Sequence, residues 1–427
     1  FAIRRQRQMC IRDRVLPDMS AEIWLIIFIG FIILNFAFSS ILEYINDKNW
    51  KNEIPTELKD YYNKAQYLKA KNYKKARGKV SLISSCLSTS LTILILYTGF
   101  YGYVSDYIHE IYSSKFIHSG IFFLFFYLIN MIVSIPVSYY STFIIEEEFG
   151  FNKTSLGTFF ADIIKGILMT LIIGGILLGA ALFIYDYFSD GFWIWLWIGL
   201  SLFTIFISMF YTTLIVPIFN KLSPLENGTL KEKIENYSKG IGYSLKNIFI
   251  IDGSKRSSKA NAYFSGLGPR KTIALFDTLV EKHTEEELVA VLAHEVGHYK
   301  KNHIKQGMFI SIFQIGMMCY LFELCTKLPE ITSALGAEVG AFHLGLIGFS
   351  LLFSPIGLIL GVFGNILSRK NEFEADSYAK ETYDGESLKL ALKKLSVDSL
   401  TNLYPHPLYV FIHYSHPPLL ERLKALG

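Results

Sequence analysis

The sequence predicts a mostly α-helical, polytopic membrane protein with seven transmembrane helices and a small α+β domain. The chain of 427 residues is 51% hydrophobic and 15% aromatic, and its mean hydropathy is positive. Soluble domains of this total length are usually less apolar. An HExxH motif at 294–298 adds a second prediction, because that motif places two metal-ligating histidines on one helix.

Seven apolar runs are long enough to cross a bilayer, which takes about 20 helical residues. The run at 307–327 is the least regular, because Gln314 and Glu323 interrupt it. In a bundle of several spans such side chains can face the protein interior or a wet cavity. The predicted spans are 23–43, 83–104, 117–140, 164–186, 191–217, 307–327 and 341–366.

Basic residues are concentrated in particular loops, so the net charge of +4 does not indicate a nucleic-acid-binding surface. By contrast, 105–116 contains only Lys115, and 187–190 and 328–340 contain no Lys or Arg. The positive-inside rule places the basic loops in the cytosol, and with seven spans the carboxyl terminus lies there too. The basic loops are 43–82, 218–306 and the residues after 367.

The first 18 residues fit this scheme poorly, since five arginines before residue 15 would draw the amino terminus inward. We expect a non-native or disordered segment there, because Met19 precedes the first span and that span is too long for a signal peptide. The chain then divides into this segment at 1–18, spans one to five at 19–217, a domain that contains the HExxH motif at 218–306, spans six and seven at 307–366, and the rest of that domain at 367–427.

The HExxH motif lies in a predicted amphipathic helix. His294 and His298 are four residues apart, so they share one face and can converge on a single zinc ion. Glu295 lies beside the first histidine, where it can act as general base toward a water molecule. Thr284 and Glu287 form a capping-box pattern that starts this helix before its apolar positions begin.

A small sheet is predicted before the helix. Segments 247–251, 261–265 and 272–276 are apolar or alternating and read as strands, with 266–269 as a Gly- and Pro-containing turn. Such an order suits a zinc protease, since an edge strand beside the metal can bind an extended substrate by backbone pairing.

A catalytic zinc site needs a third protein ligand and an open position, and 368–378 offers three acidic candidates. Glu372 and Asp376 are four apart, so Glu372 can ligate zinc while Asp376 accepts the free N–H of a liganding histidine. Glu374, on another face, is the alternative ligand. His303 does not share the ligand face of the HExxH helix and is expected to be a cytosolic surface residue.

These motifs resemble the Ste24 branch of the M48 family of integral-membrane zinc metalloproteases, whose eukaryotic members are CaaX prenyl proteases. The resemblance covers most of the chain, although Asn371 replaces a usual aromatic residue. It implies seven helices around a water-filled chamber with the zinc site at the cytosolic end. The matching stretches are 148–157, 217–226, 257–266, 274–279, 294–298, 368–379 and 413–423.

The resemblance also implies roles for individual residues. Glu372 becomes the third zinc ligand, Asn261 and Ala262 lie on the strand that pairs with substrate, and His416 and Arg422 lie near the scissile peptide. The implied role of His416 is oxyanion stabilisation. From the residues alone, a His-Pro-Pro sequence is more often a simple helix break, and His413 is an equally polar alternative.

The predicted function is zinc-dependent peptide hydrolysis with one zinc ion per chain, held by His294, His298 and Glu372, and with Glu295 as base. The expected partners are a peptide or protein substrate, with a prenylated C-terminal tail as one candidate, and the lipid bilayer of the bacterial inner membrane or the eukaryotic endoplasmic reticulum. A quality-control protease without a prenyl requirement is the alternative. A channel or transporter with a structural zinc is disfavoured, because structural sites are usually closed and thiolate-rich.

Overall fold

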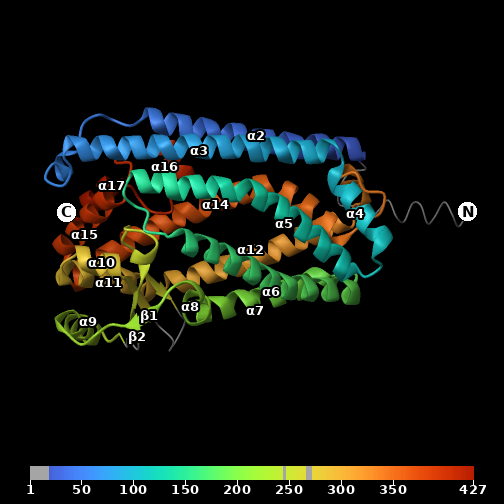
Figure 1. Ribbon diagram of the computed structural model, residues 1–427. Helices are drawn as coiled ribbons and strands as arrows, with labels where there is room; N and C mark the ends of the chain where they lie inside the picture. The colour runs from blue at the N-terminus through green and yellow to red at the C-terminus, as the bar shows by residue number, and fades with distance from the viewer. Residues whose placement is uncertain (1–18, 244–246, 266–271) are drawn as a thin grey trace, which may run out of the picture.

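The computed structural model describes residues 19–243, 247–265 and 272–427. Within that part of the chain, seven helices are long and apolar enough to cross a membrane, as the sequence predicts. They run side by side in Figure 1. The sequence makes predictions for the segment 1–18 and for the turn 266–269, and both lie outside the described residues. The helices that form the spans are α2 (Ala21–Lys48), α3 (Lys64–Tyr97), α5 (Lys115–Tyr140), α6 (Leu156–Phe188), α7 (Phe192–Leu214), α12 (His303–Thr326) and α14 (Phe342–Thr382).

The remaining helices are short and connect the spans or build the polar end of the molecule. They are η1 (Thr56–Leu58), α4 (Phe100–Ile111), η2 (Ser141–Glu146), α8 (Val216–Phe219), α9 (Thr229–Gly240), η3 (Gly253–Lys255), α10 (Asp277–Lys282), α11 (Glu285–Lys300), α13 (Pro329–Ala334), α15 (Gly385–Asp398), α16 (Pro407–His413) and α17 (Leu419–Leu426).

The second span ends earlier than predicted. The prediction of one continuous span through residue 104 was wrong. The helix α3 ends at Tyr97, and α4 begins as a separate helix after Gly99. Gly99 has a left-handed φ of 65°, which breaks the helix. The backbone of Gly336 then packs so closely on α4 that a Cβ at Gly102 would lie 2.0 Å from its carbonyl carbon.

Glu323, which interrupts the sixth predicted span, lies near the end of α12. Its carboxylate accepts the backbone N–H groups of Gly191 and Trp193, each at 3.0 Å, and pairs with Lys327 at 2.9 Å. Because these are free amides of the first turn of α7, the acidic side chain is satisfied and stabilises that helix start.

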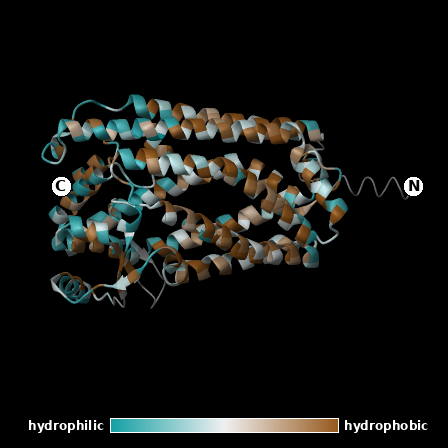
Figure 2. Ribbon diagram, in the orientation of Figure 1, coloured by the Kyte–Doolittle hydropathy of each residue, from teal (hydrophilic) through white to brown (hydrophobic). Residues whose placement is uncertain are grey.

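The two largest buried cores among the described residues lie toward opposite ends of the helices. One consists of aromatic and aliphatic residues of α2, α4, α5, α7, α12 and α14, including Phe28, Phe122 and Phe322. The other lies beneath the polar end and joins the sheet to α9, α11, α15 and α17. Figure 2 shows hydrophobic residues along the long helices and hydrophilic residues gathered at the end that carries the C-terminus.

The sheet has four strands in the order β1-β2-β4-β3. β2 and β4 are parallel, with Ile248 opposite Ile273, while β1 and β3 pair antiparallel with β2 and β4. The sequence predicted β2, β3 and β4 and missed β1. The strand β3 begins at Ala262 rather than at residue 261. Their bounds are β1 (Leu222–Pro224), β2 (Asn247–Ile251), β3 (Ala262–Ser265) and β4 (Thr272–Phe276).

The polar segment after α5 contains Glu146 at the end of η2, and this carboxylate is not freely solvated. The Glu146 side chain is 17% exposed and pairs with Lys259 at 3.0 Å, and it accepts the hydroxyl of Tyr73 at 2.6 Å. Lys153 N–H also donates to Arg256 C=O at 3.0 Å. The segment therefore holds the chain that leads into β3.

Within the bundle, a cavity of about 1090 Å³ lies between α2, α3 and α14. Hydroxyl side chains of α3, such as Ser84, Ser88 and Thr92, line it together with Glu43 and Asp47 of α2. Polar groups at such a depth need water or protein partners. This cavity lies inside the helix bundle, where the resemblance implies a chamber.

Candidate active site

The HExxH motif lies on α11, which starts as the sequence predicts. Thr284 accepts the amide of Glu287, and the Glu287 side chain accepts the amide of Thr284, so two free donors of the first turn are satisfied. Leu288, Leu292 and Val296 are buried in the core below the sheet. This packing fixes the face of α11 that carries both motif histidines.

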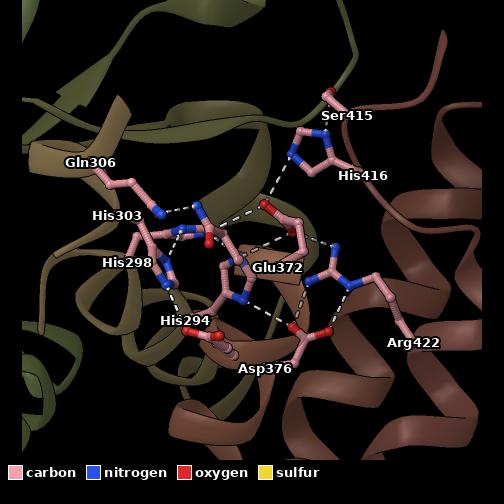
Figure 3. Close-up of polar contacts among 11 residues, drawn as sticks. His294, His298, His303, Gln306, Glu372, Asp376, Ser415, His416 and Arg422 are labelled. Carbon is pink, nitrogen blue, oxygen red and sulfur yellow. Dashed lines mark hydrogen bonds and ion pairs between the residues drawn. The ribbon is translucent and has the colours of Figure 1, made fainter. Parts of the chain in front are cut away.

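The side chains of His294, His298 and Glu372 converge, as Figure 3 shows. The Nε2 atoms of the two histidines are 3.2 Å apart. Glu372 Oε1 lies 3.2 Å from His298 Nε2, and Oε2 lies 3.5 Å from His294 Nε2. Each of the three residues offers one potential ligand atom, and these three atoms all lie within 4.8 Å of one another. Glu374, the alternative ligand, is outside this group.

Small residues allow α14 to bring Glu372 this close. Gly297 of α11 packs against Ala375 of α14. A Cβ at Gly297 would lie 3.1 Å from the Cα and from the carbonyl oxygen of Ala375. Both positions are fully or nearly fully buried. The backbones of the two helices therefore approach closely, and all three candidate ligands lie on α11 and α14.

The three residues fit a divalent cation. Glu372 Oε2 is buried and has no hydrogen-bond partner in the described part of the chain, although imidazole nitrogens and a guanidinium surround it. A buried acceptor of this kind needs a partner. Two imidazole nitrogens and one carboxylate oxygen form a donor set that suits zinc with a further position left open.

Asp376 and Arg422 lie behind the ligands. Asp376 Oδ1 is 2.9 Å from His294 Nδ1, a short contact without hydrogen-bond alignment. Arg422 donates to both Asp376 oxygens at 2.8 and 2.6 Å, and its NH1 lies 3.3 Å from Glu372 Oε2. Burial alone would lower the pKa of His294, but Asp376 and Glu372 outweigh it and raise that pKa to about 9. The buried carboxylates thus create a strongly cation-binding environment.

A cavity of about 480 Å³ opens beside the ligands. Glu295 lines it and is partly exposed, and His416 lines it from the segment before α17. His416 Nε2 lies 3.3 Å from Glu372 Oε1, its side chain is 64% exposed, and Ser415 Oγ holds its Nδ1 at 2.9 Å. A polarisable bond placed in this cavity would therefore meet a carboxylate base and an imidazole donor.

Asn261 and Ala262 line the same cavity. Ala262 opens β3, which is at one edge of the sheet and pairs only with β4 among the described strands. Asn261 directly precedes that strand, and its side chain accepts the Ala262 amide at 2.9 Å. The structure thus brings the predicted edge-strand residues and the predicted ligands to one cavity, while Arg422 also contacts the carboxylates.

His303 was expected at the surface, and this was wrong. It is 7% exposed, and its Nδ1 lies 3.1 Å from His298 Nδ1. α11 ends at Lys300, and Asn302, with a φ of 61°, turns the chain into α12. Helical periodicity cannot extend across that turn, so the five-residue spacing gave no sign of the contact. Asn371, which departs from the family pattern, donates to Gln306 at 3.3 Å.

Comparison with known proteins identifies the family to which this chain belongs. A family described as the CAAX prenyl protease N-terminal region, with five membrane helices, matches 43–221, and peptidase family M48 matches 224–427. CAAX prenyl protease 1 of Saccharomyces cerevisiae is 33% identical over 94% of this chain and 95% of its own length. The chain belongs to peptidase family M48. The human homolog is 32% identical over 87% of this chain and 88% of its own length.

A solved structure supports the same family. The crystal structure of S. mikatae Ste24p has a TM-score of 0.88 to this chain at 33% identity, and the match covers 95% of this chain and 99% of that one. The predicted Ste24-type fold and family are confirmed. The chain is a multi-pass membrane metalloendopeptidase that acts on peptide or protein substrates with a metal cofactor.

Proposed function

We propose that this M48 enzyme is a zinc endopeptidase that cleaves the prenylated C-terminal CaaX tails of proteins. The observation that carries the proposal is the convergence of His294, His298 and Glu372 beside a cavity that also contains Glu295 and an edge strand. The relatives' name, CAAX prenyl protease 1, supports the choice of substrate.

His294, His298 and Glu372 would hold one zinc ion per chain. When bound, zinc polarises a carbonyl and lowers the pKa of water. Asp376 lies 2.9 Å from His294 Nδ1, and Arg422 pairs with both Asp376 and Glu372. With these partners the Glu372 carboxylate stays ionised and fixed toward the histidines.

The other residues of the cavity carry the proton and the substrate. Glu295 takes a proton from the attacking water and later gives it to the leaving amine. His416 donates from Nε2 to the oxygen on which negative charge develops. The substrate adds as an extended strand beside Asn261 and Ala262. This geometry favours flexible or terminal segments, because a compact domain cannot present an extended backbone.

Residues 218–306 and 367–427 together form the catalytic part, and 19–217 and 307–366 anchor it. We place that part on the cytosolic side, because the lysine-rich loops belong to it or lie at the same end. The partners are then a protein tail and the bilayer, and no nucleic acid is needed.

The test compares a farnesylated CaaX peptide with its unprenylated twin, incubated with the purified full chain in the same detergent. We expect zinc-dependent cleavage, with at least tenfold higher kcat/KM for the prenylated peptide, or about 1.4 kcal/mol of transition-state binding. Glu381→Gln, a change of an exposed carboxylate bonded to Ser377, serves as control. Equal cleavage of both peptides would refute the CaaX proposal and favour the quality-control alternative.

A further inference from the structure

The Nδ1 atom of His298, which points away from the other candidate ligands, has a hydrogen-bond partner of its own. His298 Nδ1 lies 3.1 Å from His303 Nδ1, and His303 Nε2 lies 3.1 Å from Glu374 Oε2. Figure 3 shows the His298 and His303 side chains next to each other beside the ligand group, with their rings at an interplanar angle of 71°. The three side chains come from α11, α12 and α14. The sequence predicted no role for His303 and treated Glu374 only as an alternative ligand.

The proton positions in this row follow from the geometry. His298 directs Nε2 at Glu372 and at the other histidine, so metal binding needs Nε2 free of a proton. A neutral imidazole then carries its proton on Nδ1 and donates to His303 Nδ1. His303 must accept there, so it carries its own proton on Nε2 and donates to Glu374. An ionised carboxylate only accepts, and the row ends.

We propose that His303 and Glu374 are positioning residues that fix the tautomer and the ring orientation of His298, and thereby set the affinity of the metal site. This inference rests on the proposed function only in that His298 is taken as a ligand. Partners of this kind raise the basicity of a ligating imidazole and lower the entropy it loses on binding.

The two ligand histidines are supported unequally. His294 faces Asp376 directly, and the Asp376 side chain is 2% exposed. His298 reaches a carboxylate only through a second imidazole, and the Glu374 side chain is 39% exposed, with Lys370 3.7 Å from its other oxygen. Solvent and Lys370 compete for Glu374, so we expect the His303 ring to contribute more to the affinity than the terminal carboxylate does.

A purely structural role for His303 is the competing explanation, since it is buried and opens α12. The two roles predict different responses to substitution. His303→Gln keeps an acceptor and a donor on one side chain, whereas His303→Leu keeps apolar volume and loses both. A positioning role distinguishes these variants in metal affinity, and a packing role does not.

The experiment measures zinc affinity of the purified full chain by competition with a chromogenic chelator. The absorption spectrum of the Co²⁺-loaded protein reports the geometry of the ligands. The variants are His303→Leu, His303→Gln and Glu374→Gln, with Glu381→Gln as the matched control on the same helix. Thermal unfolding of each metal-free variant reports any loss of fold.

We expect His303→Leu to weaken zinc binding by about 10–100-fold and to alter the Co²⁺ spectrum. His303→Gln should recover most of that loss, Glu374→Gln should weaken binding by a smaller factor, and the control should match wild type. Unchanged affinity in His303→Leu would overturn the proposal, as would equal losses in His303→Leu and His303→Gln that track a fall in thermal stability.

The proposed function fails in a different way. If His298→Ala leaves zinc affinity at the wild-type value, the ligand assignment itself is wrong. If His298→Ala abolishes binding while His303→Leu has no effect, the ligand assignment stands and only the positioning role is refuted.

Discussion

The helix α14 carries a histidine-containing polar cluster at each end, and the two clusters differ in their partners. Near its start, His343 is fully buried and contacts the hydroxyls of Ser105 at 2.9 Å and Ser119 at 3.0 Å. Near its other end, Glu372 and Asp376 face the histidines of α11. Along a helix of 1.5 Å rise per residue, the two clusters are about 40 Å apart.

The difference shows what distinguishes the proposed metal site from a second cluster of histidines. His118 and His343 lie with ring centroids 4.5 Å apart, yet hydroxyls and the Ser105 carbonyl satisfy them as neutral rings. No carboxylate completes a metal-binding group there among the described residues. At the other end the carboxylates of Glu372, Asp376 and Glu374 face imidazoles of His294, His298 and His303. Carboxylate partners, rather than the number of histidines, therefore distinguish the proposed metal site from the other cluster.

The largest expected effect is all-or-none and concerns the two sides of the membrane. In a variant without native cysteines, a cysteine at Lys282, near the carboxylate-rich end, should react with an impermeant thiol reagent only after the inner face is exposed. A cysteine at Asp190, whose side chain is 92% exposed, should react from outside. Labelling of both positions from one side would contradict the cytosolic placement of the catalytic part.

Removing a carboxylate from the metal end should abolish binding. Glu372→Ala deletes one of three ligand side chains and leaves Arg422 beside an empty acceptor position, so we expect loss of most bound zinc and of peptidase activity. Metal analysis and a peptide assay check this. Glu381→Ala on the same helix is the control, and retention of one zinc per chain by Glu372→Ala would refute the ligand assignment.

Changing the base should separate chemistry from binding. Glu295 lies beside His294 but outside the ligand group, so Glu295→Gln should keep about one zinc per chain while kcat falls by roughly 10²–10⁴-fold, the usual contribution of a general base. Zinc content and kcat are measured on the same preparation. Parallel loss of zinc and activity would show that Glu295 serves the metal rather than the proton transfer.

Sequence reasoning succeeded where a contact follows from local periodicity. The i,i+4 spacing in α11 and in the far turn of α14 placed His294 with His298 and Glu372 with Asp376, and the apolar runs located all seven spans. It failed where the chain turns between elements. The left-handed Asn302 returns His303 to the site, and the Glu146–Lys259 pair joins residues 113 positions apart. Neither contact leaves a short-range signal.

The smallest expected effect concerns the hydroxyl-bonded end of α14. His343→Ala removes a fully buried ring that packs on Phe122 at a centroid distance of 4.2 Å and leaves two buried hydroxyls with one partner fewer. The cavity and the lost hydrogen bonds together should cost about 2–4 kcal/mol. We expect a lower thermal unfolding temperature in detergent with unchanged zinc content and unchanged Co²⁺ spectrum.

The matched control is His109→Ala at the same end. His109 is exposed, with its ring 5.5 Å from that of His118, so its loss should change stability by no more than about 0.5 kcal/mol. If His343→Ala instead reduced zinc affinity in a fully folded chain, the two ends of α14 would be coupled. The helix would then transmit a change over about 40 Å, and the two clusters could no longer be treated as independent sites that share only a scaffold.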